Sequence, residues 1–175
     1  MIIKIRNMAL CGMFSAMLCL CAWLSVPFGD VAITLQTFGI FLALSVLGGK
    51  RGTVVILVYL VLGAAGLPVF AGFRGGVGAL IGVTGGYLTG FFVCGLVYWL
   101  LTALFPKQEL PAMAAGLAVC YCFGSLWYYN VYINGGGAVT VGYIIIKCIL
   151  PYLVPDIIKL LLARQLSQKL KQFVY

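Results

Sequence analysis

Apolar runs without a charged residue follow one another along this chain. Met8 to Val26, Gly85 to Phe105 and Ala112 to Val131 contain no Asp, Glu, Lys or Arg. A helix needs about 20 predominantly apolar residues to cross a bilayer. The whole chain has 11 Lys/Arg and 3 Asp/Glu in 175 residues, whereas about 25% of a soluble domain is charged. The sequence therefore predicts an all-α integral membrane protein in a lipid bilayer.

Further apolar runs extend from Ile33 to Leu47, from Thr53 to Gly66 and from Pro155 to about Leu170. We expect Pro151 and Pro155 to break the chain, so that a short helix from about Thr140 to Leu150 precedes the last span. Pro155 would then occupy the first turn of that span, where proline is well tolerated. The sequence thus predicts six transmembrane helices. We expect them to form a single transmembrane domain over residues 1–175, with no separate soluble domain.

Basic residues predict the orientation, because cytoplasmic loops are enriched in Lys and Arg. Six spans with both termini in the cytoplasm place only Arg74 and Lys147 outside, while Lys159 falls within the last span. The cytoplasmic residues are then Lys4, Arg6, Lys50, Arg51, Lys107, Arg164, Lys169 and Lys171. The net charge of +8 therefore indicates membrane topology and not a nucleic-acid partner.

Several catalytic chemistries are excluded by what the chain lacks. There is no His, and the only acids are Asp30, Glu109 and Asp156, so His-based triads and His metal sites cannot form. The seven Cys include no C-x-x-C pair, and we interpret them as small residues packed between helices. The expected protein is not an enzyme and has no metal site and no cofactor.

Asp156 and Lys159 form the most informative pair, because ionisable residues within a span are rare and mark functional sites. Three residues apart, they share one face of a helix and can pair with each other or converge on a ligand. We expect Asp156 in the first helical turn, where free N–H groups stabilise an anion. A carboxylate accepts hydrogen bonds and an ammonium donates them, so the pair suits a neutral urea, lactam or pyrimidine-like ring.

Other polar residues are expected in the same outer compartment. Glycines are dense from Gly72 to Gly86, and this segment is either a wall or lid of a site or a flexible external turn. Arg74 could hold an anionic tail of a ligand or face lipid headgroups. Thr34 and Gln36 begin the second span, and Thr84 and Tyr87 begin the fourth; each alone is typical of a cap, but together they favour a site.

Small residues repeat along the first span. Gly12 and Ala16 are four apart, and Ala9 lies one turn earlier. Such spacing lets another helix approach closely, so this face is predicted to pack against a helix of this chain or of a partner.

Four motifs in these regions resemble those of the BioY family, the biotin-binding S components of energy-coupling factor transporters. They occur in the family's order along nearly the whole chain: Ile33–Phe38, Leu62–Gly72, Thr84–Phe91 and Pro155–Lys159. The resemblance implies a six-helix, multi-pass protein in the plasma membrane of a prokaryote. It would bind biotin from outside and work with a transmembrane T component and two ATPase subunits, without an ATPase site of its own.

The resemblance also implies roles for single residues. Asp156 and Lys159 match an Asp-x-x-Lys that helps to hold the ureido ring, and Gln36 matches the outer start of the second helix. Thr84, Gly85, Gly86 and Tyr87 match a pocket segment, and Gly12 and Ala16 resemble the face that docks on the T component. The family often has Pro before Thr-Gly-Gly-Tyr and some members have Asn nearby, whereas this chain has Gly82-Val83. A backbone group or water would then replace the side-chain contact at Gly82.

Two alternatives stay open from the sequence. The chain could be an S component for another vitamin, or an assembly subunit in which the Asp156–Lys159 pair is purely structural.

Overall fold

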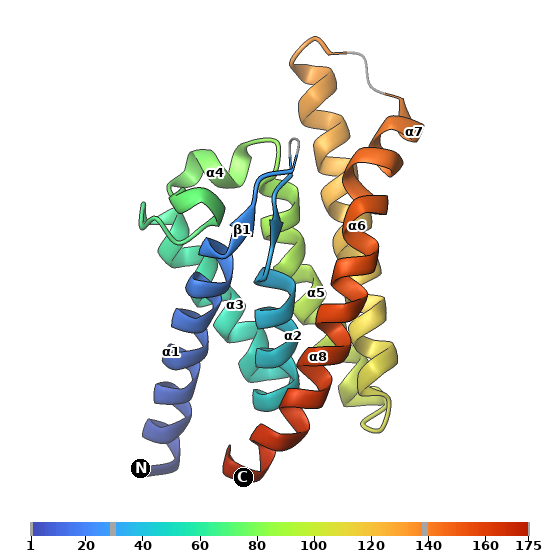
Figure 1. The fold of residues 1–175 in the computed structure, drawn as a ribbon. Coiled ribbons are helices and arrows are strands. Elements are labelled where there is room, and N and C mark those ends of the chain that lie inside the picture. The colour runs from blue at the N-terminus through green and yellow to red at the C-terminus, as the bar shows by residue number, and fades with distance from the viewer. Residues whose placement is uncertain (1, 29–30, 138–139, 175) are drawn as a thin grey trace.

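The computed structural model describes residues 2–28, 31–137 and 140–174. In this part of the chain six helices are longer than ten residues, and they form one bundle (Figure 1). They are α1 (Ile2–Trp23), α2 (Gln36–Leu47), α3 (Gly49–Ala64), α5 (Gly85–Leu104), α6 (Glu109–Asn134) and α8 (Leu150–Val174). Both termini lie at the same end of the bundle (Figure 1).

Short elements cover the end of the bundle opposite the termini (Figure 1). A hairpin pairs β1 (Ser25–Val26) with β2 (Ile33–Thr34) in antiparallel register. The glycine-rich segment folds into the 3₁₀ turn η1 (Ala71–Phe73) and α4 (Val77–Ile81). The helices α7 (Val141–Ile144) and η2 (Ile145–Ile149) lead into α8.

The short helix α2 is the centre of the bundle and packs against α1, α3, α5 and α8. Every residue of α2 except Phe38 is buried, because a helix that is apolar on all sides is stable only inside a protein. Its 12 residues span about 18 Å at 1.5 Å per residue. Since its neighbours are longer, the polar residues at its start lie inside the bundle and not at its end (Figure 1).

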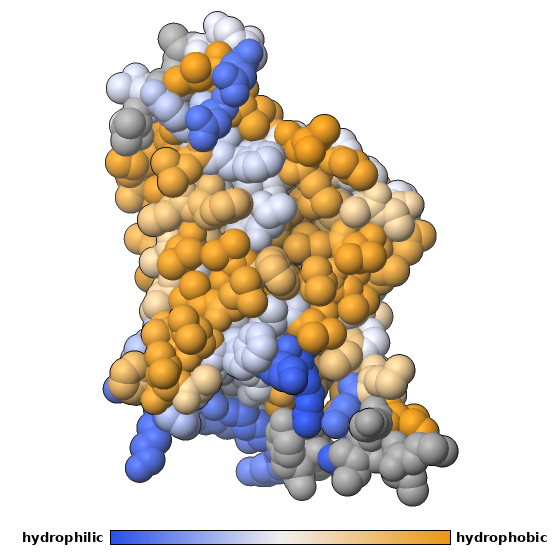
Figure 2. All heavy atoms as spheres, turned by 180° about the vertical axis from the view of Figure 1, so that it is seen from behind, coloured by the Kyte–Doolittle hydropathy of each residue, from blue (hydrophilic) through white to orange (hydrophobic). Residues whose placement is uncertain are grey.

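Three helices of the described residues are long and apolar enough to cross a membrane: Ile5–Trp23 of α1, α5 and α6. The remaining long helices are shorter or carry more charge. An apolar band covers the middle height of the face seen in Figure 2, and the most hydrophilic residues gather mainly at the lower end. The prediction that the chain is mostly helical, with long apolar helices, is confirmed.

The predicted break in the last part of the chain is wrong. Helical structure continues from Val141 through the π-helical η2 into α8, and Pro155 lies inside α8. The amide of Leu150 donates to the carbonyl of Ile145, and this wider turn sits directly before Pro151. In a continuous helix, the only backbone groups left without a hydrogen bond are the few whose partner would be the missing N–H of proline. A break in apolar surroundings would leave many more backbone N–H and C=O groups unpaired.

Glycine allows the helices around α2 to approach closely. A Cβ added at Gly52 would lie 2.6 Å from Cα of Leu44 in α2, and one at Gly49 would lie 2.6 Å from Cα of Trp99 in α5. Between the apolar runs that end at Leu47 and begin at Thr53, only Gly48, with φ of 80°, interrupts the helices, and Gly49 and Gly52 belong to the packed start of α3.

Replacing Gly52 by Ala should destabilise the protein, because the new methyl group meets the backbone of α2. We expect a loss of about 1–3 kcal/mol, seen as a lower melting temperature in detergent. The control is Gly12→Ala in α1, where the added Cβ meets nothing within 4 Å and the gain in helix propensity is the same. Equal melting temperatures for the two variants would contradict this account of the α2–α3 contact.

Candidate ligand-binding site

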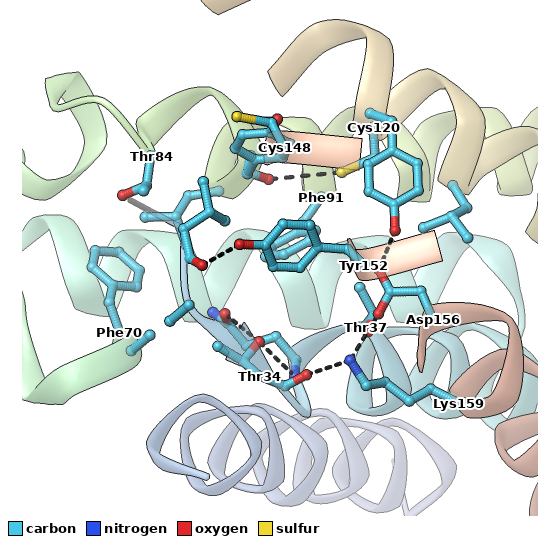
Figure 3. Close-up of a pocket in the computed structure, with 18 of the residues that line it drawn as sticks. Thr34, Thr37, Phe70, Thr84, Phe91, Cys120, Cys148, Tyr152, Asp156 and Lys159 are labelled. Carbon is cyan, nitrogen blue, oxygen red and sulfur yellow. Dashed lines mark hydrogen bonds and ion pairs between the residues drawn. The ribbon is translucent and has the colours of Figure 1, made fainter. Parts of the chain in front are cut away.

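A pocket lies at the start of α2 and is also lined by residues of the hairpin, the glycine-rich segment, α5, α6 and α8. Inside it lies about 780 Å³ of space free of protein atoms, a volume that includes open solvent at its mouth. Its wall is largely apolar; Thr34, Thr37, Asp156 and Lys159 gather in one part of it, and Thr84 lies in another (Figure 3). The apolar part of the lining includes Val31, Ala32, Phe70, Ala71, Ala79, Leu88, Phe91, Leu117, Cys120 and Cys148.

Asp156 is the most densely hydrogen-bonded side chain of the pocket. Its Oδ1 accepts from Oγ1 of Thr37 at 2.8 Å and from Nζ of Lys159 at 2.7 Å, and its Oδ2 accepts from the hydroxyl of Tyr121 at 2.5 Å. The three donors come from α2, α8 and α6. An ionised carboxylate has about four lone-pair positions, so one acceptor position stays available beside these partners.

Lys159 neutralises this carboxylate and ties it to the hairpin. Its Nζ donates to Asp156 and also, at 2.6 Å, to the backbone carbonyl of Thr34 in β2 (Figure 3). Asp156 is 5% exposed and Lys159 is 9% exposed. An ammonium has three N–H donors, so one donor stays available besides these two bonds. The two residues share one helical face, as expected, and they form an ion pair, which is one of the two possibilities that their spacing left open.

The expected helix terminus at Asp156 is wrong. Because α8 begins at Leu150 and is preceded by η2, Asp156 lies in a continuous helix, where its own backbone offers no free N–H group. The carboxylate is stabilised instead by the hydroxyls of Thr37 and Tyr121 and by Lys159.

Most of the other polar residues expected from the sequence meet in this pocket. Thr34, Gln36, Arg74, Thr84 and Tyr87 all line it. Arg74 is exposed, and its Nε donates to the carbonyl of Ala71 at 3.1 Å. The glycine-rich segment thus forms a wall of the pocket.

The three predicted glycines have a packing role next to the pocket and are not part of its lining. A Cβ at Gly86 would lie 2.1 Å from Cβ of Trp127, and one at Gly85 would lie 1.8 Å from the carbonyl oxygen of Leu80. The indole of Trp127 donates to the carbonyl of Gly82 at 3.0 Å. Through these contacts the start of α5 packs against α4 and α6, and Thr84 and Tyr87 are thereby held in position.

Three pocket residues that form hydrogen bonds through a hydroxyl group were not predicted. Thr37 follows Gln36 directly and Tyr152 lies one helical turn before Asp156, so each had a neighbour in sequence that pointed to the site. Tyr152 donates to the carbonyls of Phe28 and Val31 and so ties the hairpin to α8. Tyr121 lies within an apolar run of α6, and only the tertiary fold brings it to Asp156.

The predicted docking residues lie on the outside of the bundle. Ala9, Gly12 and Ala16 are all exposed on α1, and nothing lies within 4 Å of a Cβ built at Gly12. Within the described residues, this face is therefore not used for packing inside the chain.

Solved structures share this fold. The bundle resembles the crystal structure of the S-component for biotin from an ECF-type ABC transporter, with a TM-score of 0.82, 24% sequence identity and coverage of 97% of this chain and 92% of that one. It also resembles the S component of a bacterial ECF transporter, with a TM-score of 0.58, 20% identity and coverage of 96% and 99%. The structure therefore has the S-component fold.

Sequence comparisons give the family. The BioY family model matches residues 1–175. The biotin transporter BioY of Thermotoga maritima is 39% identical over 173 residues, which cover 95% of this chain and 96% of the relative. The probable biotin transporter BioY of Pyrococcus horikoshii is 36% identical over 168 residues, with coverage of 96% and 98%. This chain belongs to the BioY family, as its motifs predicted.

The buried pair should show strong coupling in unfolding experiments. Lys159→Met leaves the Asp156 carboxylate without its counter-ion, and we expect a loss of about 3 kcal/mol or more. Asp156→Asn should also destabilise, but the double variant should lose less than the sum of the two single losses, as measured by thermal unfolding in detergent.

The second ion pair provides the matched control. Nζ of Lys171 lies 2.6 Å from Oε1 of Glu109, but both side chains are about one-third exposed. A pair of this kind contributes about 0–1 kcal/mol, so Lys171→Met should have little effect. Additive losses for Asp156 and Lys159 would contradict their assignment as one buried unit.

Proposed function

We propose that this protein is the biotin-binding S component of an energy-coupling factor transporter and serves biotin uptake. Membership of the BioY family and the names of its relatives support biotin as the ligand. The observation that carries the proposal is the neutralised Asp156–Lys159 pair in the pocket. The carboxylate has one acceptor position left and the ammonium has one donor left, and a ureido ring offers an N–H group and a carbonyl that can pair with them.

The rest of the pocket fits the rest of biotin. The apolar wall with Phe70, Phe91 and Leu117 suits the sulfur-containing ring and the aliphatic chain, which have no polar hydrogen atoms. Arg74 belongs to an exposed part of the lining, where its guanidinium can pair with the carboxylate at the end of the chain. The two polar ends of one ligand would thus meet two different charged side chains.

We further propose that the bundle crosses the plasma membrane of a prokaryote six times with both termini in the cytoplasm. The termini lie at one end of the bundle, and the hairpin and the glycine-rich segment lie at the other (Figure 1). Both of these segments contribute to the pocket lining, so the pocket would face the outside. The helices that are short for a complete crossing, such as α2, are extended by the hairpin and by the loops that line the pocket.

Delivery into the cell requires energy from partner subunits in this proposal. The exposed face of Ala9, Gly12 and Ala16 on α1 would contact a transmembrane T component, which in turn binds two ATPase subunits. The described part of the chain is a helical bundle with short loops, and we assign ATP hydrolysis to those partners.

Biotin binding to the purified protein, measured by isothermal titration calorimetry, tests the ligand. Asp156→Asn and Lys159→Ala should weaken binding by at least about tenfold, because each removes a hydrogen bond between a charged group and the ureido ring, which contributes about 1.5–3 kcal/mol. Lys171→Met is the control and should bind like the unmodified protein. Normal binding by the Asp156 and Lys159 variants would show that the site is elsewhere.

The same experiment separates the alternatives. If the protein binds thiamine or riboflavin and not biotin, it is an S component for another vitamin. If it binds none of these ligands, the result supports the hypothesis that the protein is an assembly subunit in which the Asp156–Lys159 pair is purely structural.

Docking can be tested apart from ligand binding. A bulky Gly12→Leu side chain should prevent close approach of the T component and abolish co-purification with it, while biotin affinity stays unchanged. Ala118→Leu is a matched control, because Ala118 is also an exposed small residue but lies on α6. Retained association of the Gly12→Leu variant would rule out this face as the docking surface.

A further inference from the structure

Tyr59 of α3 is fully buried and is not part of the pocket lining, but it contacts Gln36, which does line the pocket. Its hydroxyl accepts a hydrogen bond from Nε2 of Gln36 at 2.6 Å. We propose that Tyr59 is a positioning residue for the ligand: it fixes the orientation of the Gln36 carboxamide in the pocket. This inference rests on the proposed function and extends it to a residue that does not touch the ligand.

The carboxamide of Gln36 is held from two sides. While Nε2 donates to Tyr59, Oε1 accepts from the hydroxyl of Thr34 at 2.9 Å. An amide side chain has two N–H donors and two acceptor lone pairs, so one of each is left for a ligand. Without Tyr59 the amide loses the contact that keeps its nitrogen on the α3 side, and its donor and acceptor can exchange places.

Tyr59 is also connected to the charged pair through this amide. Thr34, which donates to Gln36, offers its backbone carbonyl to Nζ of Lys159 at 2.6 Å. Lys159 in turn donates to Asp156. A continuous chain of hydrogen bonds thus extends from α3 through the start of α2 to α8, and Tyr59 is its end on the α3 side.

The ring of Tyr59 supports the apolar wall as well. It packs edge-on against Phe70, with ring centroids 5.4 Å apart and an interplanar angle of 81°. Phe70 lines the pocket, and it lies so close to α3 that a Cβ at Gly63 would be 2.0 Å from its ring. Tyr59→Phe keeps this ring contact and removes only the hydroxyl, so it isolates the effect on Gln36.

A double-mutant cycle of biotin affinity tests the proposal. Tyr59→Phe should weaken binding about threefold to tenfold, the range for one hydrogen bond. In a Gln36→Leu background the same substitution should change affinity by less than twofold, because the amide that it positions is gone. Tyr98→Phe is the control: Tyr98 is equally buried, but it lies next to Ser45 and outside the pocket lining, so its loss should leave affinity unchanged.

Unchanged affinity of Tyr59→Phe, or an equal loss in both backgrounds, would overturn the positioning role. Melting temperatures of the same four proteins without ligand provide a second test that does not depend on biotin. Hydrogen bonding between Tyr59 and Gln36 predicts that the two losses of stability are less than additive, and additive losses would overturn the proposal. If the unmodified protein binds no biotin, the proposed function fails, while the melting cycle still decides about Tyr59.

Discussion

The negative charge of Asp156 inside an apolar bundle is the constraint on which the site depends. A carboxylate in such surroundings is stable only when a counter-ion and hydrogen-bond donors replace water. Lys159 supplies the charge, and Thr37 and Tyr121 supply donors from two other helices. The pair therefore joins α2, α6 and α8 at one level, and the polar side of the pocket exists only where these helices meet.

The shortness of α2 explains how polar residues reach that level. Because its 12 residues are nearly all buried and start inside the bundle, Gln36 and Thr37 lie below the hairpin and the glycine-rich segment, directly after Thr34 at the end of β2. The close contacts at Gly49 and Gly52 hold the neighbouring α3 against α2 and α5. The packing of α3 in the lower bundle therefore also affects the pocket, because α3 places the hydroxyl of Tyr59 within hydrogen-bond distance of Gln36.

Much of the fold was predictable, because charge-free runs in a chain with so few charges have few alternatives to membrane helices. Asp156 and Lys159 were predictable for the same reason: an ionisable pair is conspicuous among apolar residues. The continuous helix around Pro151 and Pro155 was not, since proline breaks helices in water and the π-helical turn of η2 leaves no mark in the sequence. Tyr121 and Tyr59 were not predictable either, because a tyrosine in an apolar run has no pattern that identifies its hydroxyl partner.

A structure of the protein with bound biotin tests the central claim most directly. The account predicts the ureido ring between Asp156, Lys159 and Gln36, the carboxylate of biotin toward Arg74, and the fused rings and chain against Phe70 and Phe91. Biotin bound outside this pocket, or bound with its ureido ring at Arg74 and its carboxylate away from any cation, would contradict it.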